Sequence, residues 1–138
     1  MHDLPIKVAR IFNAYGPRMQ PQDGRVISNF VVSALRGEPL TICGSGRQTR
    51  SFCCVDDLVD GLLRLMHSPH AVTGPMNLGN PGEFEMLDLA ELVSELTGVE
   101  AEFQSLPLPE DDAQRRRPLI EEARKTLAGV PRPRCGMV

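Results

Sequence analysis

Three short clusters of polar residues carry the side chains that could bind a ligand. Asn13 follows an apolar run and precedes Gly16 and Pro17, so its amide could contact a ligand beyond the end of a strand, or bond its own backbone in an ordinary turn. Arg50 ends the run Gly44-Ser-Gly-Arg-Gln-Thr-Arg, in which glycines permit close backbone approach and a guanidinium could grip a diphosphate through its planar fork of donors. The alternative for this second cluster is a flexible hairpin loop with solvated arginines.

The third cluster combines three acids with three arginines, at 110–112 and 115–117. A charge run of this kind typically forms a solvated face on which the arginines pair with the neighbouring acids. Each exposed pair would contribute only ~0–1 kcal/mol to stability, so structural need explains the cluster poorly. The alternative is an anion clamp in which one arginine turns inward.

Several motifs of complete catalytic centres are missing from this sequence. No glycine-rich turn of the G-x-G-x-x-G type follows a first strand. Tyr15 has Met19 four residues later, so it cannot form a tyrosine–lysine acid–base pair one helical turn apart. His2, His67 and His70 are scattered and suggest no catalytic triad. No pair of the four cysteines has C-x-x-C spacing, which predicts reduced thiols and no metal site.

The composition is that of a globular domain. The 138 residues are 41% hydrophobic and 24% charged, but they are too few for two βαβαβ halves plus a substrate lobe. The net charge of −3 gives no reason to expect nucleic acid or an anionic membrane as a partner. No stretch approaches the ~20 apolar residues that span a bilayer, and the first residues do not resemble a signal peptide. We therefore expect a cytoplasmic protein.

Hydrophobic periodicity predicts alternating strands and helices. Four helices are expected. The first runs from Val26 to Leu35 and stops at Gly37, and the second begins at a cap, Asp56 or Asp57, and runs to 66. The other two span 86–96 and 120–127. Strands are expected over 39–43, 50–55, 74–78 and 101–104, and the run over 6–12 should be a parallel strand buried on both faces. This first strand has no earlier βαβ partner in the sequence, so its neighbours in a sizeable sheet would come from elsewhere.

Together, these motifs resemble the C-terminal portion of the UDP-glucuronate decarboxylases (UDP-xylose synthases), a branch of the extended short-chain dehydrogenase/reductase, or NAD-dependent epimerase/dehydratase, family. The resemblance covers about 5–127. Its most specific parts are Gly-Pro-Arg-Met followed by Asp-Gly-Arg-Val, then Gln-Thr-Arg-Ser-Phe and Arg-Arg-Pro. It implies an α/β fold made of the end of a Rossmann-type sheet and a small α/β substrate lobe, without the glycine-rich N-terminal half. It assigns 1–130 to this nucleotide-sugar-binding portion, and we expect a disordered tail over 131–138.

The resemblance also implies where a UDP-sugar would bind. Asn13 and Arg25 would contact the sugar nucleotide, and Arg50 would hold its diphosphate. The uridine would be lined by four successive residues, Leu40, Thr41, Ile42 and Cys43.

By the same resemblance, Arg116 would be the catalytic residue near the substrate carboxylate, supplying a proton through water during decarboxylation. The cofactor would be NAD, with Ala14, Gln20 and Arg25 on the cofactor side, although its complete site is not expected in this chain. No metal is implied.

The resemblance leaves several functions open. Members of this branch convert UDP-glucuronate to UDP-xylose and CO2 through a 4-keto intermediate. This chain would carry mainly the UDP-sugar-binding residues and is expected to be inactive alone, because hydride transfer needs a bound nicotinamide and a base. One alternative is a non-catalytic module that binds UDP-sugars, forms a homo-oligomer or pairs with an intact family member. A second is a sister epimerase or dehydratase. A third is a truncated product that folds poorly by itself.

Overall fold

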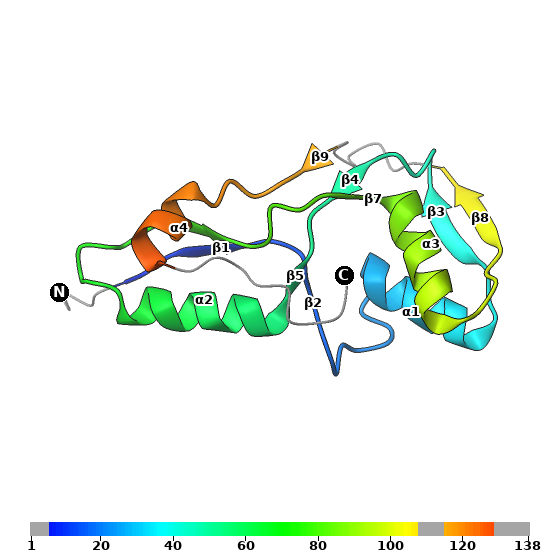
Figure 1. The fold of residues 1–138 in the computed structure, drawn as a ribbon, viewed down its shortest axis with the longest axis horizontal. Coiled ribbons are helices and arrows are strands. Elements are labelled where there is room, and N and C mark those ends of the chain that lie inside the picture. Colours follow the sequence, from blue (N-terminus) through cyan, green and yellow to red (C-terminus); the bar gives the residue numbers. More distant parts are fainter. Residues whose placement is uncertain (1–5, 108–114, 129–138) are drawn as a thin grey trace. The chain divides into compact units, whose positions relative to one another are not determined.

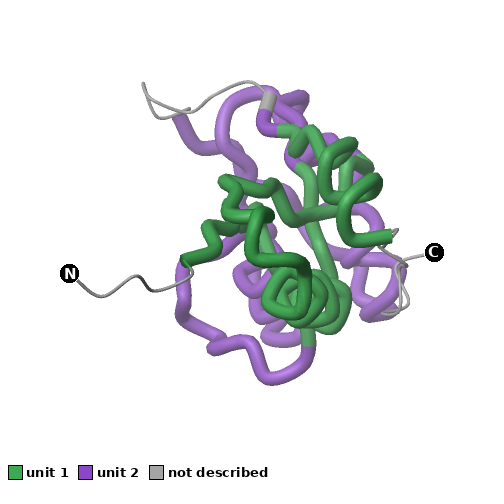
Figure 2. Tube along the Cα trace, turned by 90° about the vertical axis from the view of Figure 1, so that its left-hand side faces the viewer, with its two compact units in different colours: residues 1–16, 51–82, 117–138 green, residues 17–50, 83–116 purple. Residues whose placement is uncertain are grey.

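The described residues form two compact units, each built from separate stretches of the chain. The structure is a computed structural model that describes residues 6–107 and 115–128. Unit 1 comprises the described residues within 1–16, 51–82 and 117–138, and unit 2 comprises those within 17–50 and 83–116 (Figure 1, Figure 2). Strands and helices alternate along the chain, which confirms the predicted α/β class. The tail predicted over 131–138 lies outside the described residues.

Unit 1 is organised around two parallel strand pairs. β1 (Ala9–Ile11) pairs with β6 (Met76–Leu78), and β2 (Ala14–Tyr15) pairs with β5 (Cys53–Cys54). β1 is shorter than the predicted run over 6–12, and Ile11 is 55% exposed, so the prediction of a strand buried on both faces is wrong. The reason is that β6 is the only strand that pairs with β1 among the described residues.

Two helices complete unit 1. α2 (Val55–His67) and α4 (Glu121–Leu127) both contact β6 and contact each other. The cap predicted at Asp56 or Asp57 is wrong: Cys54 is the N-cap, and both acids lie in the first turn, where a carboxylate still interacts favourably with the helix dipole. The core is an apolar cluster of seven buried residues, Cys53, Leu58, Leu65, Met76, Leu78, Ala123 and Leu127.

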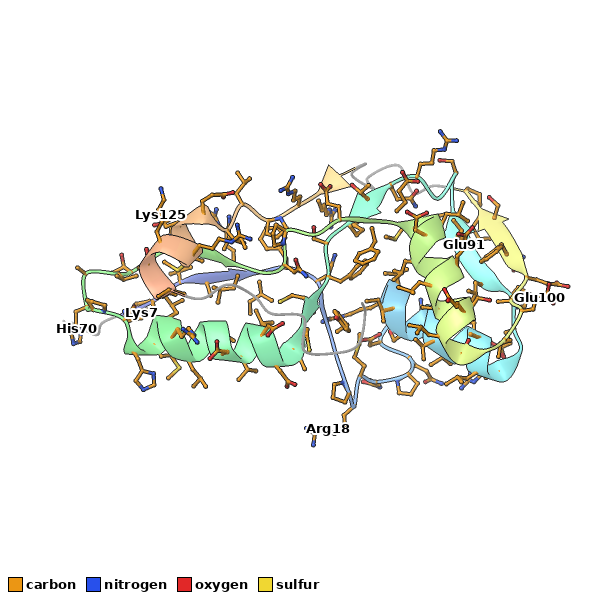
Figure 3. The ribbon with its side chains drawn as sticks, viewed as in Figure 1. Lys7, Arg18, His70, Glu91, Glu100 and Lys125 are labelled. Carbon is orange, nitrogen blue, oxygen red and sulfur yellow. The ribbon has the colours of Figure 1, made fainter. Side chains whose placement is uncertain are left out.

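The side chain of Lys7 ties the start of unit 1 to the segment after α2. Its ammonium donates hydrogen bonds to the carbonyls of Ser68, Pro69 and Val72 at 2.9–3.0 Å and to the Ser68 hydroxyl at 2.8 Å (Figure 3). Four acceptors around one ammonium fix the direction in which the chain enters β1.

Unit 2 packs two helices against a parallel strand pair. α1 (Val26–Arg36) and α3 (Met86–Thr97) contact each other and β3 (Leu40–Cys43), which pairs with β8 (Phe103–Leu106). Both helices end where glycine was expected to stop them, at Gly37 and Gly98, whose φ values of 68° and 67° lie in the left-handed region that favours glycine. No helix in the described ranges has the length and apolar character to cross a membrane.

A second sheet in unit 2 joins three distant segments. β4 (Thr49–Arg50) is its central strand, with β7 (Phe84–Glu85) antiparallel on one side and β9 (Arg115–Arg116) parallel on the other. The predicted extended piece over 50–55 is therefore two separate short strands, β4 and β5.

The turn between β3 and β4 caps α3. The carbonyls of Gly46 and Gln48 accept hydrogen bonds from the N–H groups of Leu87 and Met86, at 3.1 and 3.2 Å, and Gln48 Nε2 donates to the Cys43 carbonyl at 2.9 Å. Gly46 has a φ of 72°, and a Cβ there would lie 2.9 Å from Ile42 Cγ2. The close approach permitted by this glycine is therefore to the start of α3.

The start of α1 is fixed by the carboxylate of Asp23. One oxygen accepts a short hydrogen bond from the Ser28 hydroxyl and a 3.0 Å bond from the Arg25 N–H, and the other lies 3.6 Å from Arg25 Nε. The Ser28 hydrogen bond contributes most, followed by the Arg25 N–H, and together they lower the pKa of Asp23 below its ordinary value of 3.8.

Replacing Gly46 by alanine should destabilise the chain more than replacing Gly37. The Gly37→Ala variant costs about 1–2 kcal/mol for the left-handed backbone alone, because a Cβ at position 37 meets nothing within 4 Å. The Gly46→Ala variant should cost about 1–3 kcal/mol more, because its Cβ crowds Ile42. Urea unfolding of both variants measures the difference, and equal costs would contradict the packing assigned to Gly46.

Replacing Asp23 by asparagine should lower the stability at pH 7 and change its pH dependence. Because the pKa is lower in the folded state, the carboxylate stabilises the fold above the unfolded pKa, and this contribution is lost as pH falls through the folded pKa. The difference in unfolding midpoint between wild type and Asp23→Asn should therefore shrink from pH 6 to pH 2. Ser28→Ala should move the acid transition to higher pH, and a difference that does not change with pH would disprove this role.

Candidate functional site

Asn13 lies just beyond the carboxyl end of β1, where ligands bind in open α/β sheets. Its side-chain Nδ2 donates to the Ser51 carbonyl at 3.3 Å, and its own carbonyl accepts from the Cys53 N–H at 2.8 Å. The Nδ2 group of this amide therefore bonds a segment 38 residues away along the chain. Asn13 is exposed in this structure.

Arg50 and Arg116 lie side by side in the three-stranded sheet of unit 2. They are in register across the parallel strands β4 and β9, so both side chains leave the same face of the sheet. Arg50 is only 8% exposed, and its Nη1 donates to the Thr49 carbonyl at 2.8 Å, whereas Arg116 is exposed. An anion that reaches both positions could bond to the two guanidinium groups at once.

The acids of the third sequence cluster, at 110–112, lie outside the described residues. Their predicted pairing with the arginines therefore stays a prediction. Thr49, next to Arg50, donates its hydroxyl to Glu83 Oε1 at 2.9 Å, which links β4 to the loop before β7. Of the arginine run, Arg116 is the residue that the sheet brings beside Arg50.

A cavity of about 450 Å³ lies within unit 2, between the loop before α1, α1 itself and β3. Side chains of a strand alternate between its two faces. Thr41 and Cys43 therefore line the cavity, whereas Leu40 and Ile42 are 0% and 6% exposed in the core. The two buried residues could offer a ligand only their backbone groups.

Polar residues of α1 line the same cavity, and the motif analysis did not single them out. Asn29, Ser33 and Arg36 are four and three positions apart, which places them on one face of the helix. Their helical spacing was the sequence signal that could have identified them, since it places them beside the apolar stripe that predicted the helix. With Thr41 and Glu38, they give the cavity both hydrogen-bond donors and acceptors.

The residues expected on the cofactor side do not all fall in one unit. Gln20 and Arg25 lie in the loop before α1 in unit 2, and both are exposed, whereas Ala14 is half-buried in β2 of unit 1. The Gln20 carbonyl accepts from the Asp23 N–H at 3.3 Å.

The described residues do not form a phosphate cradle for a dinucleotide. Gly24 precedes α1, but the Asp23 carboxylate, which accepts from the Arg25 N–H and the Ser28 hydroxyl beside that helix start, would repel a phosphate. The first N–H groups of α3 are bound by the carbonyls of Gly46 and Gln48, and α2 follows β5 without a glycine. Within the same ranges, no group of three His, Cys, Asp or Glu side chains is arranged to hold a metal ion.

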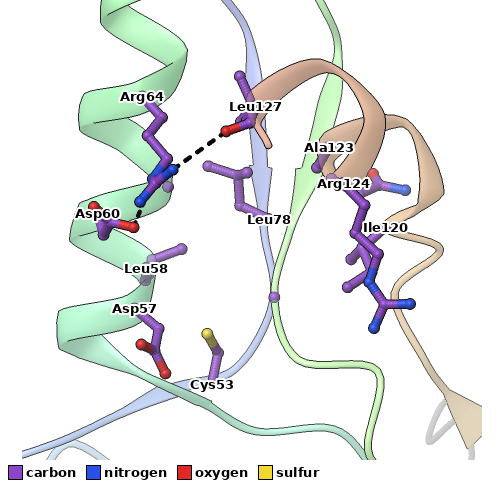
Figure 4. A pocket seen from close by; sticks show the side chains of 13 residues that line it. Cys53, Asp57, Leu58, Asp60, Arg64, Leu78, Ile120, Ala123, Arg124 and Leu127 are labelled. Carbon is purple, nitrogen blue, oxygen red and sulfur yellow. Dashed lines mark hydrogen bonds and ion pairs between the residues drawn. The ribbon is translucent and has the colours of Figure 1, made fainter. Parts of the chain in front are cut away.

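A smaller cavity of about 50 Å³ lies in unit 1 between α2, β6 and α4 (Figure 4). At its edge, Arg64 Nε donates to Asp60 Oδ2 at 2.7 Å, and Arg64 Nη1 donates to the Leu127 carbonyl at 3.4 Å. Burial, with a further contribution from Asp57, raises the pKa of the Cys53 thiol to about 11, so this thiol stays protonated at neutral pH. None of the predicted site residues lines this cavity.

Comparison with curated proteins gives extensive matches. UDP-glucuronic acid decarboxylase 5 of Arabidopsis thaliana is 52% identical over 131 residues, which cover 95% of this chain and 38% of that protein. UDP-glucuronic acid decarboxylase 1 of Danio rerio is 50% identical over 128 residues, covering 93% of this chain and 30% of that protein. The chain thus spans between 30% and 38% of the length of these relatives, as expected for a portion of such a protein.

Solved structures match the fold over a similar extent. An epimerase from Methanothermobacter thermautotrophicus is 33% identical with a TM-score of 0.89, over 94% of this chain and 39% of that chain. UDP-glucuronic acid 4-epimerase from Bacillus cereus, in complex with UDP-glucuronic acid and NAD, is 27% identical with a TM-score of 0.85, over 94% of this chain and 41% of that chain.

The family assignment rests on a model that matches more than half of the chain. The model described as the NAD dependent epimerase/dehydratase family covers residues 1–79. The decarboxylase and epimerase matches extend over nearly all of the sequence. The chain belongs to the NAD dependent epimerase/dehydratase family, as its sequence motifs predict.

Proposed function

We propose that this chain is the UDP-sugar-binding portion of a UDP-glucuronate decarboxylase. The observation that carries the proposal is the register of Arg50 with Arg116, which concentrates two positive charges on one face of a small sheet. A nucleoside diphosphate sugar acid carries its negative charges at two places, the diphosphate and the carboxylate. Two neighbouring guanidinium groups, each with a planar fork of donors, suit such a ligand.

The proposed roles follow from exposure and position. Arg50 holds the diphosphate, because a buried guanidinium is positioned before the ligand arrives and loses little freedom on binding. Arg116, exposed beside it, meets the sugar carboxylate and is the proposed catalytic residue, supplying a proton through water as CO2 leaves. Asn13 and Arg25 contact the sugar nucleotide.

The cavity of unit 2 is the proposed uridine site. Thr41 and Cys43 line it with their side chains, and Leu40 and Ile42 contribute backbone groups. A cavity of about 450 Å³ has the size of a small-molecule site, and its mixture of apolar and polar side chains suits a nucleoside.

NAD belongs to the proposed whole reaction, in which UDP-glucuronate becomes UDP-xylose and CO2. The described residues supply no cradle for its phosphates, so the proposed contribution of this chain is to bind and orient the sugar nucleotide. Ala14, Gln20 and Arg25 remain the proposed contacts on the cofactor side. We also propose a cytoplasmic location, in keeping with Cys43 and Cys53, which form no disulfide.

The degree of similarity favours a decarboxylase over a sister epimerase. The curated decarboxylases are 50–53% identical to this chain, whereas the B. cereus 4-epimerase is 27% identical. A non-catalytic module that binds UDP-sugars remains the second proposal, because the residues in the cavity and the arginine pair are suited to binding.

Calorimetry with UDP and UDP-glucuronate tests the binding proposal. Both ligands should bind, and Arg50→Ala should weaken binding about 10- to 100-fold, since it removes charge-assisted hydrogen bonds to the diphosphate. The matched control is Arg47→Ala, an exposed arginine of the preceding turn, which should bind as wild type does. No heat with either ligand, from protein shown to be folded, would refute UDP-sugar binding.

Turnover separates binding from catalysis. The purified chain, given UDP-glucuronate and NAD, should release no UDP-xylose or CO2, because the described residues cannot cradle the cofactor. Chromatography of the nucleotide sugars provides the measurement, with an intact UDP-glucuronic acid decarboxylase as the positive control. Sustained formation of UDP-xylose by this chain alone would contradict the proposal that it only binds and orients the substrate.

A further inference from the structure

Four neutral oxygens surround the ammonium of Lys7 where α2 ends. They are the carbonyls of Ser68, Pro69 and Val72 and the hydroxyl of Ser68, and they lie 2.8–3.0 Å from Nζ of Lys7, which is labelled in Figure 3. The segment 61–82, which supplies all four, contains no Asp or Glu. An ammonium has three hydrogens for these four acceptors, so the contact is more than a set of one-to-one hydrogen bonds. It is an arrangement in which oxygen dipoles replace the water around a cation.

The oxygens are held in place by bonds that do not involve Lys7. The Ser68 hydroxyl donates its hydrogen to the Leu65 carbonyl at 2.7 Å, which leaves the lone pairs of the hydroxyl oxygen for the ammonium. The Val72 N–H donates to the Pro69 carbonyl at 2.9 Å and closes the turn after the helix. Because these bonds do not depend on the Lys7 side chain, the oxygens should keep their arrangement when that side chain is removed.

The electrostatics of this position favour a cation of single charge. The oxygens lie at the carboxyl end of α2, where the helix dipole attracts positive charge. Divalent calcium and magnesium ions take carboxylate ligands and oxygen distances of about 2.0–2.6 Å, whereas the oxygens here are neutral and lie farther from the bound charge. Rings of neutral carbonyl oxygens suit a large monovalent cation such as potassium.

The residue that supplies the charge is of a type that is rare in this chain. Only two of the 15 basic residues are lysines, Lys7 and Lys125, and the others are arginines. Lysine carries a compact, point-like charge, whereas the guanidinium of arginine spreads its charge over a planar fork that suits carboxylates and phosphates. A compact charge is the kind that several converging oxygens can surround.

We propose that the four oxygens form a binding site for a monovalent cation, and that the Lys7 ammonium is its tethered occupant. When the charge of Lys7 is removed, a free ammonium or potassium ion binds in its place. Pro69 is exposed, and Lys7 and Ser68 are half-buried, so an ion reaches the oxygens from the solvent. The occupied cation site stabilises unit 1 by holding the entry to β1 against the end of α2.

Thermal unfolding of Lys7→Ala in chloride salts of equal ionic strength tests this proposal. Ammonium and potassium should raise the unfolding midpoint by at least about 3 °C relative to tetramethylammonium, which is too large for the oxygens to surround. The rise should saturate with ion concentration. Lithium should have a smaller effect, because it is too small to contact all four oxygens at once. If the variant is unfolded in tetramethylammonium chloride, ammonium chloride should restore its far-UV circular dichroism.

Two matched proteins control for the general effects of salt. Wild type and Lys125→Ala, which lacks an exposed lysine of α4, should show no preference among the four salts, since Lys7 fills the cation site in both.

Removing one oxygen tests whether the ion binds at this place. The double variant Lys7→Ala/Ser68→Ala lacks the hydroxyl, so the ammonium concentration that gives half of the rise in midpoint should increase about tenfold or more. An unchanged concentration would show that the ion binds elsewhere and would overturn the assignment.

The wild-type chain provides an independent measurement, because its two lysines can be compared directly. Acetic anhydride should acetylate Lys7 at least about tenfold more slowly than Lys125 in the folded chain and at a similar rate in urea, as measured by peptide mass spectrometry. Equal rates in the folded chain would overturn the proposal. So would a Lys7→Ala variant with one midpoint in all four salts, a variant that stays unfolded in every salt, or an ion preference that wild type shares.

Discussion

The pairing of β4 with β9 is the constraint on which the candidate site depends. It joins residues 49–50 to 115–116 and places Arg50 directly beside Arg116, a contact that nothing local in either segment requires. β7 pairs on the other side of β4, so the buried Arg50 is held in the middle strand of three. In the proposed function, an anion bound between Arg50 and Arg116 offsets the repulsion between their like charges.

The structural features suited to binding the sugar nucleotide are concentrated in one of the two units. Unit 2 holds the arginine pair and the cavity lined by Thr41 and Cys43, which are the features suited to a nucleoside diphosphate. Gly46 of this unit permits the close approach of the start of α3, and the Asp23 carboxylate accepts a hydrogen bond from the Arg25 N–H just before α1. The chain spans 38% of the length of the A. thaliana UDP-glucuronic acid decarboxylase 5 that it matches, and the role proposed for its described residues is to bind and orient the sugar nucleotide.

Local patterns predicted the elements that local interactions determine. The apolar stripes and terminal glycines of α1 and α3 predicted both helices almost to the residue, because helix ends depend on nearby residues. The two-residue strands β7 and β9 escaped prediction, since they exist only through pairing with β4. The resemblance assigned residues 40–43 to the uridine as one group, but alternation along β3 gives only the Thr41 and Cys43 side chains access to the cavity. The resemblance supplied Arg50 and Arg116 separately, and the sheet register joins them.

The most direct test of the anion clamp compares the melting temperatures of wild type and Arg116→Ala, with and without UDP-glucuronate. If repulsion between Arg50 and Arg116 is retained for the sake of the ligand, the unliganded variant should melt higher than wild type. The ligand should then raise the melting temperature of wild type more than that of the variant. A variant that melts lower than wild type and gains as much from the ligand would contradict the account.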